Sequence, residues 1–329
     1  MPDIILIASL AGGLVVMALA GNFLVSGSVA LAKRFGVSPL VAGIFIVGFG
    51  TSAPEMIVSA DAALAGKPGL AIGNIVGSNI ANVFLVLGIP ALIAPLAAGG
   101  VGEKRALAGM LLATALWIGI TALRPLSPLV GICFLMILIA YSGITFIRAR
   151  RAVASGADPG VTPEEDPHLS LWLAVPFVPL GIAGLILGAN LVITGGVGVA
   201  QFLNVPEEYI GLTLLAVGTS LPEIGAGVVA ALKKEGEVLI GNVMGSNLFN
   251  ILGAGGIVSL FGSVDIAPAF HRYDHWVLGI SALLLALFIV TKARIGRLTG
   301  LLLLLVYAVY IYGLISGFNL LGLFQPVPA

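Results

Sequence analysis

Long apolar runs separated by short polar connections fill this chain from one end to the other. A helix needs about 20 predominantly apolar residues to cross the hydrocarbon core of a membrane, and most runs are at least that long. We therefore predict ten membrane-spanning helices. They lie at residues 4–31, 38–65, 70–96, 106–123, 126–147, 170–202, 207–232, 238–262, 274–291 and 298–316.

Composition supports an integral membrane protein. Of the 329 residues, 59% are hydrophobic and 9% are charged, and the mean hydropathy is +1.15, far above that of soluble domains. The 45 glycines suit helices that pack closely within a membrane. The sequence contains no phosphate-binding loop, no Ser/His/Asp set and no nucleic-acid surface, and its single cysteine, Cys133, excludes an internal disulfide. We expect no enzyme activity, no cofactor, no nucleic-acid partner and no obligatory protein partner.

Basic residues are distributed unequally between the two sides of the predicted bundle. Twelve of the fifteen lie in connections that share one side: Lys33, Arg34, Lys104, Arg105, Arg148, Arg150, Arg151, Lys233, Lys234, Lys292, Arg294 and Arg297. Cytoplasmic connections carry such an excess of Lys and Arg. The distribution predicts a plasma (inner) membrane protein with both termini outside and the polar linker 148–169 in the cytoplasm.

Two stretches of the chain occur twice. "GTSAPE" at 50–55 returns as "GTSLPE" at 218–223, and "IGNIVGSNIANVFLVLG" at 72–88 returns as "IGNVMGSNLFNILGAGG" at 240–256, always 168 residues later. Each copy holds five predicted spans. Because five is odd, the second copy must enter the membrane from the opposite side, and the repeats are inverted.

These repeats define the predicted fold, an all-α polytopic membrane protein of two inverted five-helix repeats. We divide the chain into a first repeat at 1–147, a linker at 148–169 rich in Pro, Gly and mixed charges, and a second repeat at 170–329.

Glu55 and Glu223 lie near the centres of two predicted spans. A charged side chain at that depth costs at least about 2.5 to 3.5 kcal/mol. No Lys or Arg occurs at a comparable depth, so an internal salt bridge is not expected. Mobile cations remain as the partners of the two carboxylates.

Oxygen-bearing side chains surround both carboxylates in the sequence. Pro54 and Pro222, with nearby glycines, are predicted to break their helices and release backbone carbonyls. The hydroxyls and amides are Thr51, Ser52, Ser78, Asn82, Thr219, Ser220, Ser246 and Asn250. With no Cys or His nearby, this set favours hard cations over soft metals; the simpler alternative is that these residues only hold helices together.

Other polar residues keep two interpretations. Four further amides stand beside the signatures: Asn74, Asn79, Asn242 and Asn247. They are predicted to satisfy carbonyls freed where the helices bend, and we leave them outside the ligand set. Asp61 either guides cations inward or is an interfacial charge. His271 and His275 fall in "PAFHRYDHW", where we expect a solvated loop.

At these residues the chain resembles the sodium/calcium exchangers of the cation/calcium exchanger superfamily, whose two repeats carry GTSxPE-like and GSNxxN-like signatures. The resemblance implies exchange of Ca²⁺ for Na⁺ by alternating access, with Glu55 and Glu223 as principal ligands. The eight hydroxyl and amide side chains would join them, and the carbonyls of Gly48 and Ala216 would complete the sodium sites.

One departure from the family pattern and two rival functions stay open. Several relatives have Asp where this chain has Asn250, which puts potassium co-transport in doubt, and proton-coupled members usually show a GNxxE-like signature instead of GTSxPE, which favours sodium. A Ca²⁺/H⁺ antiporter using the same two glutamates is the nearest alternative. A cation channel is the alternative from another class.

Overall fold

The computed structural model describes residues 4–97, 102–154, 170–203, 216–268 and 270–316. With η denoting a π-helix, its elements are α1 (Ile4–Phe35), α2 (Pro39–Ala42), η1 (Gly43–Gly48), α3 (Phe49–Leu64), α4 (Pro68–Ile93), β1 (Leu96–Ala97), α5 (Glu103–Leu123), α6 (Pro128–Ala154), α7 (Leu171–Phe202), α9 (Ala216–Gly218), α10 (Leu221–Leu232), α11 (Gly236–Leu248), η3 (Phe249–Ala254), α12 (Gly255–Leu260), η4 (Phe270–Asp274), α13 (His275–Thr291), β2 (Arg294–Ile295) and α14 (Arg297–Ile315).

The predicted all-α membrane fold is confirmed. Within the described ranges, nine helical segments are long and apolar enough to cross a membrane. The seventh predicted span, 207–232, lies partly outside these ranges, and its described end is the short apolar helix α10. One boundary was wrong: α6 continues to Ala154, so the first residues of the predicted linker are helical.

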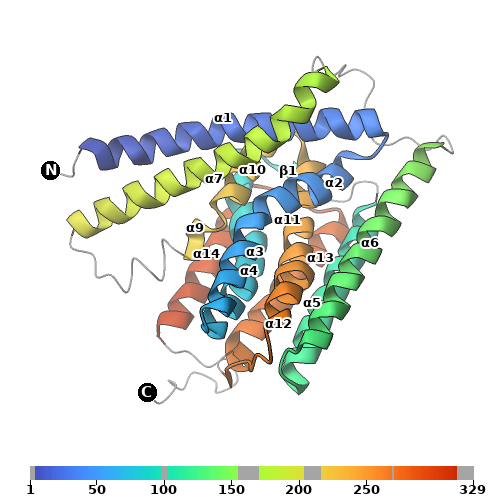
Figure 1. Ribbon diagram of the computed structural model, residues 1–329. Coiled ribbons are helices and arrows are strands. Elements are labelled where there is room, and N and C mark those ends of the chain that lie inside the picture. Colours follow the sequence, from blue (N-terminus) through green and yellow to red (C-terminus); the bar gives the residue numbers. More distant parts are fainter. Residues whose placement is uncertain (1–3, 98–101, 155–169, 204–215, 269, 317–329) are drawn as a thin grey trace.

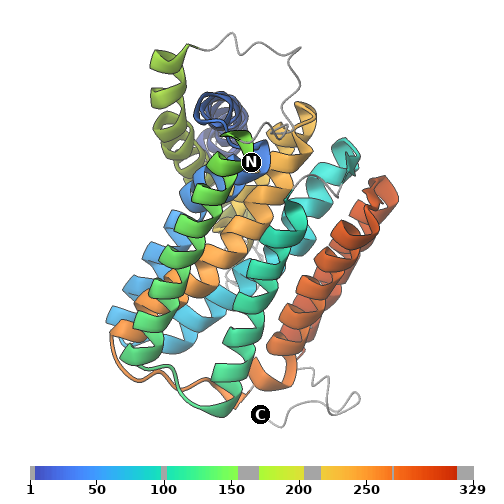
Figure 2. The same cartoon turned by 90° about the vertical axis from the view of Figure 1, so that its right-hand side faces the viewer.

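The helices form an upright bundle crossed by a tilted pair. In Figure 1, α1 and α7 run side by side and obliquely across the other helices, and in Figure 2 α1 is seen nearly end-on while α5, α6 and α14 run lengthwise. The helices that carry the GSNxxN signatures, α4 and α11, form the centre and are buried along most of their length.

Small residues bring α1 and α7 together. A Cβ atom on Gly13 would lie 2.7 Å from the carbonyl oxygen of Gly188, and one on Gly181 would lie 2.8 Å from that of Ala20. The 168-residue offset relates these two contacts to each other. We call this symmetric contact, centred on Gly13, Gly181 and Gly188, the glycine seam; close backbone approach of this kind is how membrane helices gain packing energy.

Two short strand pairings also reflect the inverted repeat. β1 pairs with β2 through Leu96 and Ile295, and an isolated bridge joins Leu126 to Val264. Leu96 and Val264 are 168 residues apart, and each pairing joins the first repeat to the second.

The predicted helix breaks are correct in one repeat only. In the second, α9 ends at Gly218 and a turn at Thr219 and Ser220 precedes α10. In the first, α3 continues through Pro54, and the irregularity is the π-helix η1 just before it. Pro54 lies inside α3, which follows η1 without a break, and the π-helix supplies irregular backbone without ending the helix.

The loop predicted at "PAFHRYDHW" is also wrong in part. Residues 270–274 form the π-helical turn η4, which continues directly into α13. His275 is consequently buried, and His271 is partly buried.

The glycine seam gives a matched pair of substitutions. Gly13→Ala should lower stability by about 1–3 kcal/mol, because its methyl group would overlap the backbone of α7. Gly12→Ala should be neutral or slightly stabilising, since nothing lies within 4 Å of a Cβ at Gly12. Thermal unfolding of the two purified variants in detergent tests this, and equal melting temperatures would contradict the seam.

Candidate ion-binding site

Glu55 on α3 and Glu223 on α10 are completely buried, with 1% and 0% of their surfaces exposed. Neither carboxylate oxygen of Glu55 has a hydrogen-bond partner among the described residues, and Oε2 of Glu223 also has none. Burying unpaired charge is costly, so this pair calls for a positive partner.

Hydroxyl groups of α3 reach across to the second repeat. Ser52 Oγ donates to Glu223 Oε1 at 3.3 Å. Thr51 Oγ1 lies 3.2 Å from Asn242 Oδ1 and 3.0 Å from the carbonyl oxygen of Val47. The GTSAPE signature of one repeat therefore contacts the glutamate and the signature helix of the other.

Two further bonds cross between the repeats in the same region. Ser246 Oγ donates to the carbonyl oxygen of Gly48 at 3.3 Å, and Asn82 Nδ2 donates to Asn247 Oδ1 at 3.0 Å. The candidate ligands Ser52, Ser246, Asn82 and Gly48 thus come together where the two repeats meet.

All four of these bonds lack a counterpart. The 168-residue offset would pair Ser220 with Glu55, Thr219 with Asn74, Ser78 with the carbonyl of Ala216, and Asn250 with Asn79. No such bond forms among the described residues, and the atoms Ser220 Oγ, Asn250 Nδ2 and Asn79 Oδ1 are buried without partners. The two repeats therefore share one set of bonding groups but use it on one side only.

The amides left out of the predicted ligand set support the helices that carry the carboxylates. Asn74 Nδ2 donates to the carbonyl oxygen of Glu55 at 3.1 Å, and Asn242 Nδ2 donates to that of Glu223 at 3.5 Å. Asn79 Nδ2 donates to Ile75 within α4. These three amides agree with the expectation that such residues satisfy backbone carbonyls, whereas Asn247 Nδ2 donates to Met110 Sδ at 3.8 Å and does not.

Buried amide atoms of two candidate ligands also remain unpartnered. Asn82 Oδ1 and both polar atoms of the Asn250 amide have no hydrogen bond among the described residues. Asn250 lies in the π-helix η3, a type of irregularity often found at functional sites. Buried polar groups are normally hydrogen-bonded, so these atoms are available to a ligand that is not protein.

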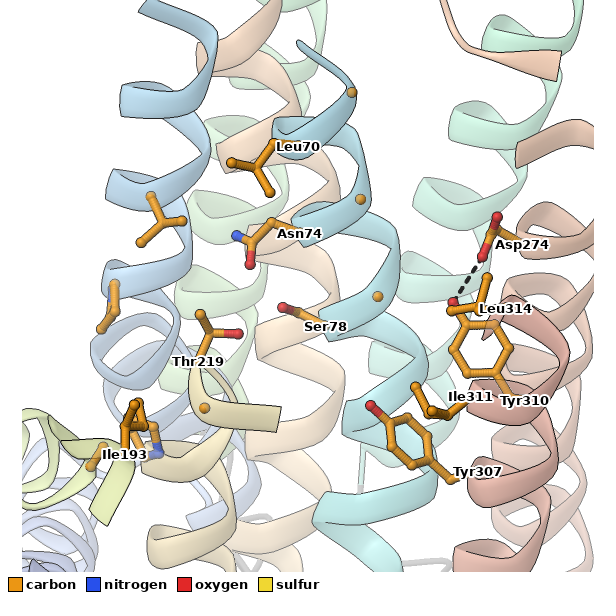
Figure 3. A pocket seen from close by; sticks show the side chains of 18 of the residues that line it. Leu70, Asn74, Ser78, Ile193, Thr219, Asp274, Tyr307, Tyr310, Ile311 and Leu314 are labelled. Atoms are coloured by element: carbon orange, nitrogen blue, oxygen red, sulfur yellow. Dashed lines mark hydrogen bonds between the residues drawn. The ribbon is translucent and has the colours of Figure 1, made fainter. Parts of the chain in front are cut away.

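A cavity of about 810 Å³ reaches the candidate ligands Ser78 and Thr219. Figure 3 shows both side chains, with Asn74 beside Ser78 on α4, while Asp274 and Tyr310 line the wall formed by η4 and α14. Asp61 is exposed and does not line this cavity.

The cavity lies on a face of α4 whose counterpart on α11 is covered. Gly245 of α11 packs against the backbone of Ile44 in η1, and a Cβ on Gly48 would lie 3.0 Å from Ser246 N. The counterpart of Gly245 is Gly77, which lines the cavity instead. Residues 207–215, which correspond to 39–47, lie outside the described residues, and Ala216 begins the described segment at α9.

The sequence missed some residues that shape the site. Asn242 Oδ1 lies within hydrogen-bond distance of the Thr51 and Ser246 hydroxyls, and Asn242 Nδ2 donates to the carbonyl oxygen of Glu223, so Asn242 connects both repeats. Asn242 could have been identified as a site residue from its place in the same repeated signature as Ser246. Asp274 and Tyr310 have no equivalent in the first repeat, and nothing in the sequence linked them to the cavity.

The donor set consists of two carboxylates and neutral oxygens. No cluster of three or more His, Cys, Asp or Glu occurs in the part of the chain that the structure describes. Hydroxyl, amide, carbonyl and carboxylate oxygens are the ligands of hard cations such as Ca²⁺. The arrangement can hold such an ion and cannot supply thiolate or imidazole ligands.

Comparison with known families gives one consistent result. The family model described as "Sodium/calcium exchanger protein" matches residues 5–147 and 173–316. The chain is 34% identical over 310 residues to the putative antiporter CaxA of Alkalimonas amylolytica, covering 92% of this chain and 97% of the relative. It is 30% identical over 333 residues to the sodium/calcium exchanger MaX1 of Methanosarcina acetivorans, covering 91% and 95%.

A solved structure shares the architecture. The sodium-calcium exchanger NCX_Mj, soaked with 2.5 mM Na⁺ and 1 mM Sr²⁺, superimposes with a TM-score of 0.78 at 32% sequence identity. The match covers 94% of this chain and 98% of that structure.

Proposed function

Because this chain belongs to the sodium/calcium exchanger family, we propose that it exchanges Ca²⁺ for Na⁺ at the site formed by Glu55 and Glu223. The observation that carries the proposal is the pair of buried carboxylates with no basic side chain paired to them among the described residues. In the proposed orientation both termini lie outside a plasma membrane.

The proposed Ca²⁺ site combines charge with neutral oxygens. Ca²⁺ takes about six to eight oxygen ligands. The carboxylates of Glu55 and Glu223 offer up to four oxygens and two negative charges, which one Ca²⁺ neutralises. Side-chain oxygens of both signatures complete the shell: Thr51, Ser52, Ser78, Asn82, Thr219, Ser220, Ser246 and Asn250. The carbonyls of Gly48 and Ala216 are the proposed additions for Na⁺.

Exchange follows from occupancy. An empty site with two negative charges is costly to bury and to carry through a closed state. Occupation by one Ca²⁺, or by several Na⁺, removes that cost. The empty site therefore does not change the side of the membrane that it faces. After one cation is released, another must bind before the site can face the opposite side again.

We attribute alternating access to hydrogen-bonding groups that both repeats carry, of which the described structure forms only one of two equivalent sets of bonds. The four bonds that cross between the repeats have four images made of the same kinds of bonding group, so the opposite arrangement can form an equal number of bonds. Two arrangements of similar energy are what a carrier needs. The paired helices α1 and α7, joined by the glycine seam, supply the element that moves against α4 and α11.

The first prediction concerns the carboxylates. Glu55→Gln and Glu223→Gln should each reduce Ca²⁺ transport to below about a tenth of the wild-type rate, because each removes a full charge from a buried site. Asp61→Asn is the matched control, since it removes an exposed charge from the same helix as Glu55. Transport above half the wild-type rate in both glutamine variants, at equal expression, would refute the assignment.

The exchange of hydrogen bonds can be tested on amides outside the proposed ligand set. Asn247→Ala removes a bond of the described arrangement, and Asn79→Ala removes its image. One bond is worth about 1 kcal/mol, or roughly fivefold in population. The two variants should therefore shift the equilibrium in opposite directions.

The equilibrium between the two arrangements can be followed with a cysteine in place of Gly77, which lines the cavity and has room for a side chain. In the opposite arrangement this position would be covered, as its counterpart Gly245 is in the described one. In a Cys133→Ala background, Asn247→Ala should slow the labelling of Gly77→Cys by a thiol reagent, and Asn79→Ala should not. Slower labelling in both variants would contradict the exchange of bonds.

The counter-ion is tested in vesicles loaded with Na⁺. An outward Na⁺ gradient should drive Ca²⁺ uptake, and an inside-positive potential should accelerate it. With three Na⁺ on two carboxylates the site carries +1, and with one Ca²⁺ it carries none, so each cycle moves one charge, worth about 2.3 kcal/mol per 100 mV. Uptake that follows a pH gradient and ignores Na⁺ would identify a Ca²⁺/H⁺ antiporter, and uptake without a counter-ion would identify a channel.

A further inference from the structure

Two histidines meet where η4 joins α13. The Nδ1 atoms of His271 and His275 are 3.2 Å apart, and their ring centroids are 4.9 Å apart with the planes inclined by 72°. His275 is buried, with 5% of its surface exposed, and its Nε2 has no hydrogen-bond partner among the described residues. The nitrogen of His275 that has a partner is therefore the one that faces His271.

We propose that His271 and His275 form a binding site for a divalent transition-metal ion such as Zn²⁺, Ni²⁺ or Co²⁺. Imidazole nitrogen bonds these ions at about 2.0–2.1 Å. Two such bonds to nitrogens 3.2 Å apart enclose an angle of about 100°, close to the tetrahedral value. The spacing already present between the two rings is that of a bidentate ligand pair.

The site is accessible from one ring only. His271 is half-buried, so an ion can approach Nδ1 of His271 and then engage the buried ring of His275. The remaining coordination positions would be taken by water. A site with two protein ligands binds more weakly than a closed structural site, which suits a reversible modulator.

Its chemistry separates it from the proposed transport site. Imidazole prefers transition metals, whereas the carboxylates and neutral oxygens around Glu55 and Glu223 prefer Ca²⁺ and Na⁺. The pair has no counterpart in the first repeat, where the equivalent residues are Glu103 and Leu107. The proposed metal site therefore occurs in the second repeat and has no equivalent at Glu103 and Leu107.

Binding would fix the start of α13. The ion would connect His271 in the π-helical turn η4 with His275 in the α-helix that follows. Between them, Asp274 accepts a hydrogen bond of 2.8 Å from Tyr310 Oη on α14 and lines the cavity. A metal ion here would stiffen that cavity wall without occupying the transport site.

The test is metal binding by the intact purified protein, independent of transport. ZnCl₂ is titrated calorimetrically into the protein in the presence of excess Na⁺ and Ca²⁺. This background protein carries no polyhistidine tag, and the substitutions His168→Ala and Cys133→Ser remove its other His and Cys ligands. We expect one equivalent to bind, with a Kd at least tenfold lower than in the additional variant His271→Ala. Arg272→Ala, an exposed neighbour, is the matched control and should bind like the background protein.

Thermal unfolding provides a second measurement. Zn²⁺ should raise the melting temperature of the background protein and of Arg272→Ala, but not of His271→Ala. Equal Zn²⁺ binding with and without His271, or no binding at all, would overturn the proposal and leave an imidazole–imidazole hydrogen bond as the only role of the pair. Neither result depends on whether the protein exchanges Ca²⁺ for Na⁺.

Discussion

The charge of two buried carboxylates governs the architecture around them. No basic side chain among the described residues pairs with Glu55 or Glu223, and burying such a pair is costly without positive charge from solution. Their position explains why the polar groups of the bundle gather where the repeats meet. It also explains why the surrounding donors are neutral oxygens: a further carboxylate would add repulsion, and a lysine would occupy the place of the cation.

The inverted repeat supplies a second constraint. A membrane helix gains little from apolar contact with another helix, because lipid is equally apolar, and therefore depends on close packing and hydrogen bonds. The glycine seam provides packing between α1 and α7 that is the same when the repeats are interchanged. The hydrogen bonds at the centre are not the same on interchange, since Ser52 bonds Glu223 while Ser220 and Glu55 remain apart. The proposed movement between two arrangements would exchange the bonds of the asymmetric core and keep the symmetric packing.

Much of the fold was predictable because hydropathy and length determine where a chain crosses a membrane. The predicted spans agree with the described helices to within a few residues, except that α6 continues to Ala154 and the seventh span lies partly outside the described residues. The repeat predicted their inversion. The local backbone was less predictable. Pro54 does not break α3, and the π-helices η1, η3 and η4 have no sequence signal, because the competing backbone bonds differ little in energy and tertiary packing decides between them. The candidate ligands were identifiable by their repetition, whereas Asn242 required the structure to show its three bonds, and the wall formed by Asp274 and Tyr310 has no repeated partner.

The hydrogen bonds between the repeats restrict which substitutions each half of the chain can accept. A residue such as Asn82 holds Asn247 in the described arrangement, and its counterpart Asn250 would hold Asn79 in the opposite one. A substitution in either half then unbalances the two arrangements, and the imbalance is relieved by the same substitution in the other half. In the proposed exchange, matching residues at such paired positions keep the two arrangements balanced. His271 and its counterpart Glu103 take no part in these four bonds, so the proposed exchange does not require the two positions to carry the same residue.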